Sequence, residues 1–285
     1  MNRLSTEQRA KVIATLVEGN SIRATCRITD TAKDTVIRLL AAVGKACKEY
    51  QDKALKNLPC KSIQCDEIWS FCYAKEKNVP IEKQGQFGYG DIWTFVAIDA
   101  ETKLVPSWML GLRNADYAYA FLKDLQGRLA SRTQLTTDGH KMYLQAVGDV
   151  FGSDIDYAML VKFYGYDPAG EARYSPAKCI GTDKLIIQGN PDNSKVSTSY
   201  VERQNLTMRM NMRRFTRLTN GFSKKAQNLE YSVALHYMYY NFCRVHKSLA
   251  NPYPRTPAMA AGLTDHVWTI EEIVNLLSHS KTNAD

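Results

Sequence analysis

Residues 62–73 read SIQCDEIWSFCY, a run of strand-forming residues with two adjacent acids, Asp66 and Glu67, in its interior. Two more runs rich in Ile, Val, Trp and Phe follow at residues 92–100 and 104–110, and turn residues bound each of them. The three runs therefore predict three consecutive strands that form a meander.

The apolar spacing becomes helical after this meander. The elements predicted next are a helix at 114–130, a strand at 134–137 that ends at Asp138, a helix at 141–150 and a strand at 155–164. This order predicts an α/β protein with a mixed five-stranded sheet and helices on both faces. Residues 165–196 carry many Gly, Pro, Asp and Asn residues, so we expect a long loop insertion there.

The first 58 residues predict a separate helical unit. Residues 5–18 and 21–28 read as a helix and a short helix, and a third helix with a stripe from Val36 to Val43 follows. This is the helix-turn-helix pattern, whose third helix would present Lys33, Thr35 and Arg38 to a major groove. A plain three-helix bundle has the same spacing. Residues 45–58 read as a polar linking helix.

The last third of the chain is predicted to be mainly helical. A helix is expected at 199–215, another at 223–244, and two short ones near 256–262 and 269–278. The predicted division is a helix-turn-helix domain at 1–58, a catalytic domain at 59–250 and a helical tail at 251–285.

Positive charge is concentrated in one stretch. The formal net charge is +8 over 285 residues, but residues 200–225 alone hold seven basic side chains against one acid, Glu202. Such clustering is typical of a nucleic-acid surface. The basic residues predicted to contact DNA here are Arg203, Arg209, Arg213 and Arg214.

The remaining composition indicates an intracellular protein. The seven cysteines include no Cys-x2-Cys pair, which favours free thiols over a zinc site. The N-terminal residues have no apolar signal core, and no run of about 18 apolar residues predicts a membrane span.

Three acids from distant parts of the chain are candidates for a metal site. Asp66 lies within the first strand, Asp138 at the end of the fourth, and Glu202 near the start of a helix. Cleaving a phosphodiester requires an activated oxygen nucleophile and neutralised phosphorane charge, which two divalent ions about 3.5–4 Å apart supply. Mg²⁺ needs only one or two carboxylates per ion.

Each acid also has an ordinary interpretation. Ser199 and Glu202 fit a capping box, and Asp138-Gly139 fits a turn. Asp66 and Glu67 point to opposite faces of a strand, and periodicity does not say which faces the site. Asp91 and Asp99 are further candidates.

Five blocks of sequence carry a family resemblance. They are QCDEIWS at 64–70, GDIWTFVAID at 90–99, LTTDGH at 135–140, STSYVERQNL at 197–206 and MYYNFCRVHK at 238–247. Together they closely resemble DDE transposases of the insertion sequence one family, in consistent order over about residues 60–269. Some members of that family have a zinc-binding cysteine cluster ahead of the helix-turn-helix, which residues 1–25 of this sequence do not contain.

The resemblance implies a ribonuclease H-like fold, two Mg²⁺ or Mn²⁺ ions and recognition of the terminal inverted repeats of a mobile element. Asp66, Asp138 and Glu202 match the catalytic triad of the family. Arg209 resembles a basic residue that contacts DNA near the cut in related integrases. The block Tyr-Asn-x-x-Arg-x-His places Asn241, Arg244 and His246, with His140, as possible supporting residues.

The expected function is that of a bacterial insertion sequence transposase. It would bind double-stranded DNA at the element ends and at the target, cut and join strands, and act in the cytoplasm on the nucleoid as at least a dimer. One alternative is a transposase-derived DNA-binding regulator that does not cut. Another is a ribonuclease H-like nuclease that does not join.

Overall fold

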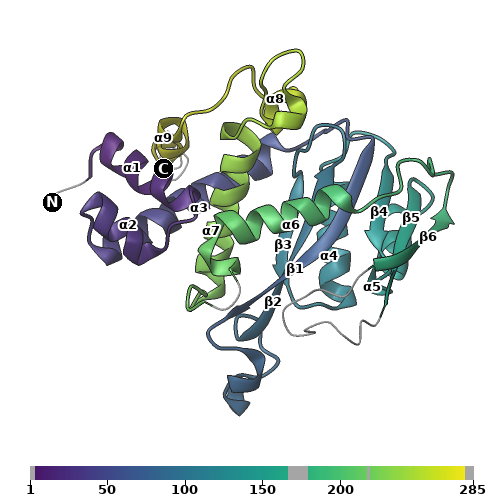
Figure 1. The fold of residues 1–285 in the computed structure, drawn as a ribbon, viewed down its shortest axis with the longest axis horizontal. Helices are drawn as coiled ribbons and strands as arrows, with labels where there is room; N and C mark the ends of the chain where they lie inside the picture. The colour runs from purple at the N-terminus through teal and green to yellow at the C-terminus, as the bar shows by residue number, and fades with distance from the viewer. Residues whose placement is uncertain (1–3, 166–178, 217–218, 280–285) are drawn as a thin grey trace.

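A six-stranded sheet forms the centre of the computed structural model, which describes residues 4–165, 179–216 and 219–279 (Figure 1). The strand order is β3-β2-β1-β4-β5-β6. The strands are β1 Ser62–Cys72, β2 Gly90–Asp99, β3 Ser107–Gly111, β4 Gln134–Asp138, β5 Asp156–Tyr164 and β6 Cys179–Gln188. This mixed sheet with flanking helices is consistent with the expected ribonuclease H-like architecture.

The strand directions follow the predicted meander and crossovers. β1, β2 and β3 pair antiparallel, whereas β4 runs parallel to β1 and β5 runs parallel to β4. The crossovers run through α4 (Ala115–Gln126) and α5 (Met142–Phe151). The side chain of Asn114 caps α4 by accepting the N–H of Tyr117, as its position before an apolar stripe favours.

The prediction of five strands was wrong, because β6 pairs antiparallel with β5. It occupies part of the predicted loop at 165–196, while residues 166–178 of that loop lie outside the described residues. Its apolar side chains Ile180, Leu185 and Ile186 are exposed. Because neither face of β6 is buried, its sequence has no one-sided apolar pattern.

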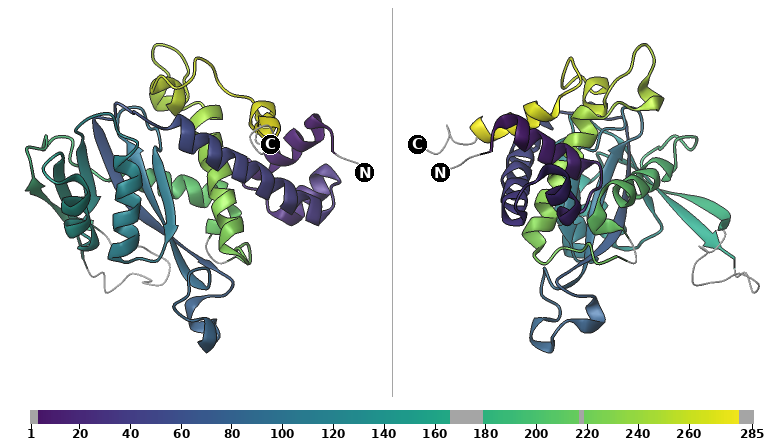
Figure 2. Two further views of the ribbon diagram at one scale, coloured as in Figure 1. Left: turned by 180° about the vertical axis from the view of Figure 1, so that it is seen from behind. Right: turned by 60° about the vertical axis from the view of Figure 1, so that its left-hand side comes forward.

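Helices cover both faces of the sheet (Figure 2). On one face Ile63 and Cys65 of β1 share an apolar cluster with side chains of α4 and α5 such as Phe121 and Tyr143. On the other face Ile68 shares a second cluster with α6 (Ser199–Asn211) and α7 (Ala226–Met238). Successive residues of β1 therefore belong to different cores, as the pleat of a strand requires.

The N-terminal helices are α1 (Thr6–Val17), α2 (Ile22–Thr29) and α3 (Lys33–Ala54). Ser5 and Gln8 form a capping box at α1, and Ser21 caps α2. The separate linking helix predicted at 45–58 was wrong, because α3 runs unbroken to Ala54. Since Ala46, Cys47 and Gln51 of α3 are buried, tertiary packing extends the helix past its polar stretch.

Helix α3 packs along α7, so the predicted boundary at residue 58 is not a break in packing. The side chain of Gln51 donates to the carbonyl of Ala234 at 3.0 Å. Gly44 lies so close to α7 that a Cβ there would be 2.3 Å from the carbonyl oxygen of Tyr231. One apolar cluster contains residues of α1, α3, β1 and α4.

The C-terminal residues return to the N-terminal helices. A π-helical turn at Tyr239–Cys243 follows α7, then α8 (Pro257–Ala260) and α9 (Ile270–His279). Helix α9 packs against α1 and α3 (Figure 1). None of the helices in the described ranges combines the length and apolar content that a membrane crossing requires.

Candidate active site

Asp66 faces helix α6. Its neighbour on the same face of β1, Gln64, accepts the N–H groups of Tyr200 and Val201 at 2.8 and 3.2 Å with its Oε1. These N–H groups belong to the first turn of α6, whose N-cap residue, Thr198, offers no side-chain cap. A strand side chain therefore caps the helix and fixes it over Asp66.

Neutral donors hold the Asp66 carboxylate. Its Oδ1 accepts the backbone N–H of Glu67 at 2.8 Å, and its Oδ2 accepts Nδ2 of Asn205 at 2.9 Å. Burial, and then the charges of Asp138 and Glu202, raise the pKa of Asp66 to about 6. Both hydrogen bonds favour the anion, but they do not offset these effects.

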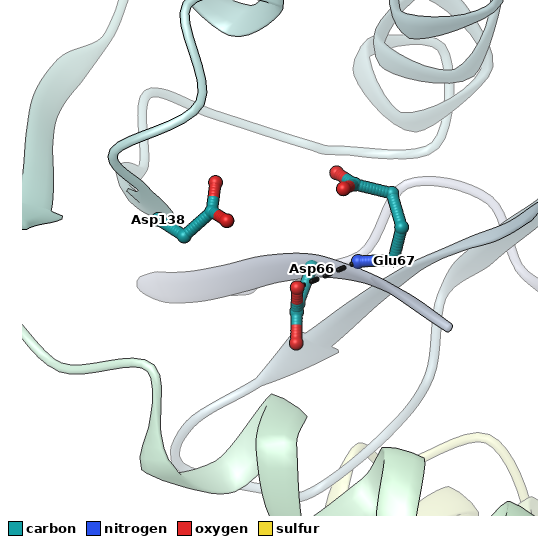
Figure 3. Close-up of side chains that lie close together, drawn as sticks. All are labelled: Asp66, Glu67 and Asp138. Atoms are coloured by element: carbon teal, nitrogen blue, oxygen red, sulfur yellow. Dashed lines mark hydrogen bonds between the residues drawn. The ribbon is translucent and has the colours of Figure 1, made fainter. Parts of the chain in front are cut away.

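Asp138 ends β4 beside Asp66, because β1 and β4 are parallel neighbours in which Cys65 pairs with Thr137, one residue before each aspartate. The N–H of His140 donates to Oδ1 of Asp138 at 3.0 Å. One carboxylate oxygen from each of Asp66, Glu67 and Asp138 lies within 4.8 Å of the other two (Figure 3). The predicted pairing of Asp66 with Asp138 is thus present in the structure.

Glu67 is an acid that the sequence did not assign to the site. It points away from Asp66, to the opposite side of β1 (Figure 3). Its Oε2 accepts Nε and Nη2 of Arg113 at 3.2 and 3.1 Å, and its Oε1 accepts the hydroxyl of Tyr143. Burial, followed by the charges of Asp138 and Asp66, raises the pKa of Glu67 to about 7 despite these partners.

Since Arg113 already pairs with Glu67, this acid links β1 to Arg113 and to Tyr143 of α5 beside the site. Arg113 also lies over the ring of Trp93, with 4.5 Å from Cζ to the ring centroid. The partners are 46 and 76 residues away from Glu67 in the sequence, so only the fold reveals them.

Glu202 lies on the first turn of α6, one turn before Asn205, and its charge raises the pKa of Asp66. Its carboxylate is exposed and accepts from Nζ of Lys162 on β5 and from the hydroxyl of Thr198. The alternative capping box at Ser199 is absent, because α6 begins with Thr198 as its N-cap and without a side-chain cap. Glu202 is therefore ion-paired with a lysine and is not a member of the group formed by Asp66, Glu67 and Asp138.

The competing aspartates have other surroundings. Asp99 is buried, and its Oδ2 accepts the N–H and the hydroxyl of Thr102 at 2.9 and 2.6 Å, which forms the turn after β2. Asp91 pairs with Phe71 near the far end of β1 from Asp66. Neither belongs to the cluster of Asp66 and Asp138.

The basic residues predicted to bind DNA occupy two neighbouring regions. Lys33, Thr35 and Arg38 lie in the first turns of α3, where Lys33 and Arg38 are exposed. On α6, Arg203 is exposed, and Nη1 of Arg209 donates to the carbonyl of Phe215 at 3.4 Å.

The single helix predicted at 199–215 was wrong at its end. Helix α6 stops at Asn211, and Arg213 and Arg214 lie in a 3₁₀ turn, Arg213–Phe215. The break occurs where Met212 and Phe215 turn into the core, with 7% and 3% of their surface exposed. Apolar burial thus overrides the helical tendency of this basic stretch.

The possible supporting residues have mainly structural contacts. Nδ1 of His140 accepts the N–H of Met142 at 3.3 Å, which orients the ring at the start of α5. Asn241 is buried and bonds both the N–H and the carbonyl of Val105 at 3.0 Å. His246 packs edge-on against Tyr240, and burial lowers its pKa to about 4, whereas Arg244 is exposed.

The donor set suits a hard divalent cation. Carboxylate oxygens are the ligands that Mg²⁺ and Mn²⁺ prefer in proteins. The mutual repulsion that raises the pKa of Asp66 is relieved when a cation lies between the acids. The residues that fit such an ion are Asp66 and Asp138, with Glu202 available once it leaves Lys162.

No protein-family model matches this sequence, and no curated protein matches it. Solved structures with a similar arrangement include an intasome of simian T-cell lymphotropic virus bound to the PP2A regulatory subunit B56 gamma, at 14% identity and a TM-score of 0.41, covering 89% of this chain and 74% of the other. A piggyBac transposase synaptic complex with hairpin DNA has 12% identity and a TM-score of 0.39, covering 98% and 71%. The Mos1 strand transfer complex has 13% identity and a TM-score of 0.26, covering 84% and 76%. Each of these three TM-scores is below 0.5.

Proposed function

We propose that this chain is a DDE-type transposase of a bacterial insertion sequence, which cuts and joins DNA with two divalent ions. The observation that carries the proposal is that Asp66, within β1, lies beside Asp138, at the end of the parallel strand β4, while Glu202 lies on the helix that packs over Asp66. In this proposal, the three acids that the family resemblance marks as a triad come from β1, β4 and α6.

The chain's own residues bind and orient in this mechanism. Asp66 and Asp138 hold Mg²⁺ or Mn²⁺, and Asn205 fixes the Asp66 carboxylate through Oδ2. When bound, the ions lower the pKa of the attacking oxygen and neutralise charge on the phosphorane. Glu202 would be a further ligand once its ion pair with Lys162 is broken. The raised pKa of Asp66 means that these ions compete with protons below about pH 6.

In this proposal, exposed basic side chains contact the phosphates of the bound DNA. Arg203 is exposed one residue after Glu202, so a phosphodiester at the metal site passes close to it. Helices α2 and α3 act as a helix-turn-helix that docks on the inverted repeats, with Lys33, Thr35 and Arg38 facing the duplex. Joining two element ends to target DNA requires at least a dimer, and the nucleoid in the cytoplasm is the place of action.

The test is cleavage of a plasmid that carries the gene with its genomic flanks, in Mg²⁺ and in EDTA. We expect nicks at the element ends with Mg²⁺ alone, and strand-transfer products when target DNA is added. Asp138→Asn removes cleavage and keeps DNA binding. The matched control is Asp149→Asn, which changes an exposed acid on α5 and keeps full activity.

The outcomes separate the alternatives. Specific binding of the flanks without cleavage in any metal would identify a regulator. Nicks without strand transfer would identify a nuclease. Full activity of Asp138→Asn would remove Asp138 from the site.

A further inference from the structure

A cavity of about 730 Å³ lies between the N-terminal helices and the segment that joins α6 to α7. One wall comes from α2 and the start of α3, including Arg23 and Lys33, and the other from the turn with Arg213 and Arg214. It is distinct from the acidic site, since neither Asp66 nor Asp138 lines it.

The charge of this cavity has one sign. The basic residues that line it are Arg23, Lys33, Arg213, Arg214 and Lys224, and no Asp or Glu is among the described residues of its walls. Within the described part of the chain, none of these five has a carboxylate at ion-pair distance. Cations gathered on concave walls concentrate their field in the space between them and attract an anion.

Arg214 is the most informative of the five. It is half-buried, and Nη1 donates to the hydroxyl of Ser223 at 2.5 Å, a neutral partner. Burial lowers the pKa of Arg214 to about 10. A desolvated guanidinium without a counter-ion is unfavourable, and a bidentate oxyanion such as phosphate supplies the missing partner.

The rest of the lining is apolar or neutral. Leu16, Ile37 and Leu235 contribute aliphatic surface, and Phe222 contributes a ring that Lys224 covers, with Nζ 4.4 Å from its centroid. The volume is in the range of pockets for small organic ligands, roughly 300–1,000 Å³, and too small for a duplex. Cations beside apolar walls are the combination that binds a nucleotide, through phosphate and base.

We propose that this cavity binds one unpaired nucleotide of a DNA strand, with its phosphate on Arg213 and Arg214 and its base against the wall formed by Ile37 and Leu235. The proposal rests on the proposed function only in taking the strand to be DNA. The cavity lies between the predicted DNA-docking helices and the end of α6. A strand held there is therefore fixed between the helices that would dock on the duplex and the acidic site that would cut it. Extruding one nucleotide costs a few kcal/mol, which apolar contacts with the base and contacts with the phosphate offset.

Binding without metal tests this directly. Fluorescence anisotropy would compare a labelled oligothymidine of about 10 nucleotides with a labelled duplex, in EDTA and about 0.1 M salt. Arg213→Glu should weaken single-strand binding about tenfold or more, because it reverses a phosphate contact. Ile37→Gln makes the apolar wall polar without changing the net charge, and should weaken single-strand binding about fivefold while leaving duplex binding unchanged.

The matched control is Lys53→Glu, an exposed reversal on the same helix α3 outside the cavity, which should change either affinity less than about twofold. Thermal melting verifies that each variant folds. Wild-type single-strand affinity in Ile37→Gln would overturn the proposal, as would an equal loss in Lys53→Glu and Arg213→Glu. Because no metal is present, a chain that never cuts DNA can still give the expected result.

Discussion

On the α6–α7 face of the sheet, Asp66 meets an amide, a backbone N–H and the fields of two other carboxylates, whereas on the α4–α5 face Glu67 meets a guanidinium and a phenol. Both acids are desolvated and both have raised pKa values. Only Asp66 keeps its charge uncompensated by a cation of the protein. Of two consecutive acids on one strand, the one without a built-in cation is the better candidate to bind a metal.

The largest expected effect is on the face that carries Asp66. Asp66→Asn keeps the size of the side chain and an oxygen that can accept from Asn205, but it removes an anionic metal ligand. Mg²⁺-dependent cleavage should therefore fall about a thousandfold or more. Stability without metal should not fall, because the anion of Asp66 is disfavoured by burial. Plasmid nicking and urea unfolding measure the two quantities. Cleavage within about tenfold of wild type would contradict the role of Asp66.

Two helical glycines also differ in how closely other segments pack against them: Gly44 of α3 touches α7, whereas a Cβ at Gly148 of α5 would meet no other segment within 4 Å. Gly44→Ala would force a Cβ to 2.3 Å from the carbonyl oxygen of Tyr231 on α7, and should lower the free energy of unfolding by about 3 kcal/mol. Gly148→Ala on α5, where nothing lies within 4 Å, is the matched control. It should raise stability by about 0.5–1 kcal/mol, since glycine disfavours helix. Equal effects would show that α3 and α7 are not in close contact in solution.

On the face that carries Glu67, the ionisation of this buried acid should make the free energy of unfolding depend on pH. Because the folded-state pKa of Glu67 is raised to about 7, its contribution to stability is highest below about pH 4.5 and is lost as the pH rises to about 7. Glu67→Gln removes that loss. Without metal, the variant should match wild type near pH 5 and exceed it by about 2 kcal/mol at pH 8 in urea unfolding. A variant less stable than wild type at pH 8 would mean that the Arg113 pair outweighs burial.

The smallest effect should come from the cation that holds Glu202. Lys162→Gln frees this carboxylate from a partly exposed ion pair worth at most about 1 kcal/mol, so Mn²⁺ affinity should rise by up to about fivefold. Lys184→Gln on β6, whose Nζ donates to the carbonyl of Asn193 at 2.6 Å, is the control and should change nothing. Calorimetric titration measures both. Unchanged or weaker Mn²⁺ binding in Lys162→Gln would remove Glu202 from the ligand set.

Local patterns were enough for most of the sheet and for the position of one acid, Asp138. Strands β1 to β5 and helices α1, α4 and α5 were predicted close to their observed positions, because one-sided apolar spacing and caps such as Ser5 and Asn114 are local signals. Asp138 follows a strand end that the sequence marks, so its place at the edge was predictable.

Long-range packing decided the rest. Strand β6 has no buried face, and α3 continues because buried residues such as Gln51 hold it against α7. Whether Asp66 or Glu67 faces α6 depends on which side of β1 packs against that helix. This is decided by contacts such as the one between Gln64 and the N–H of Tyr200, two residues that are 136 positions apart in the sequence. The ion pair of Lys162 with Glu202 joins β5 to α6, and no local pattern contains it.

The most direct test of the metal site is anomalous diffraction from crystals of the protein soaked in Mn²⁺. The account predicts a manganese peak about 2.2 Å from carboxylate oxygens of both Asp66 and Asp138, and a second that adds Glu202 in place of Lys162. Manganese bound elsewhere at saturation, with none at Asp66, would contradict the account.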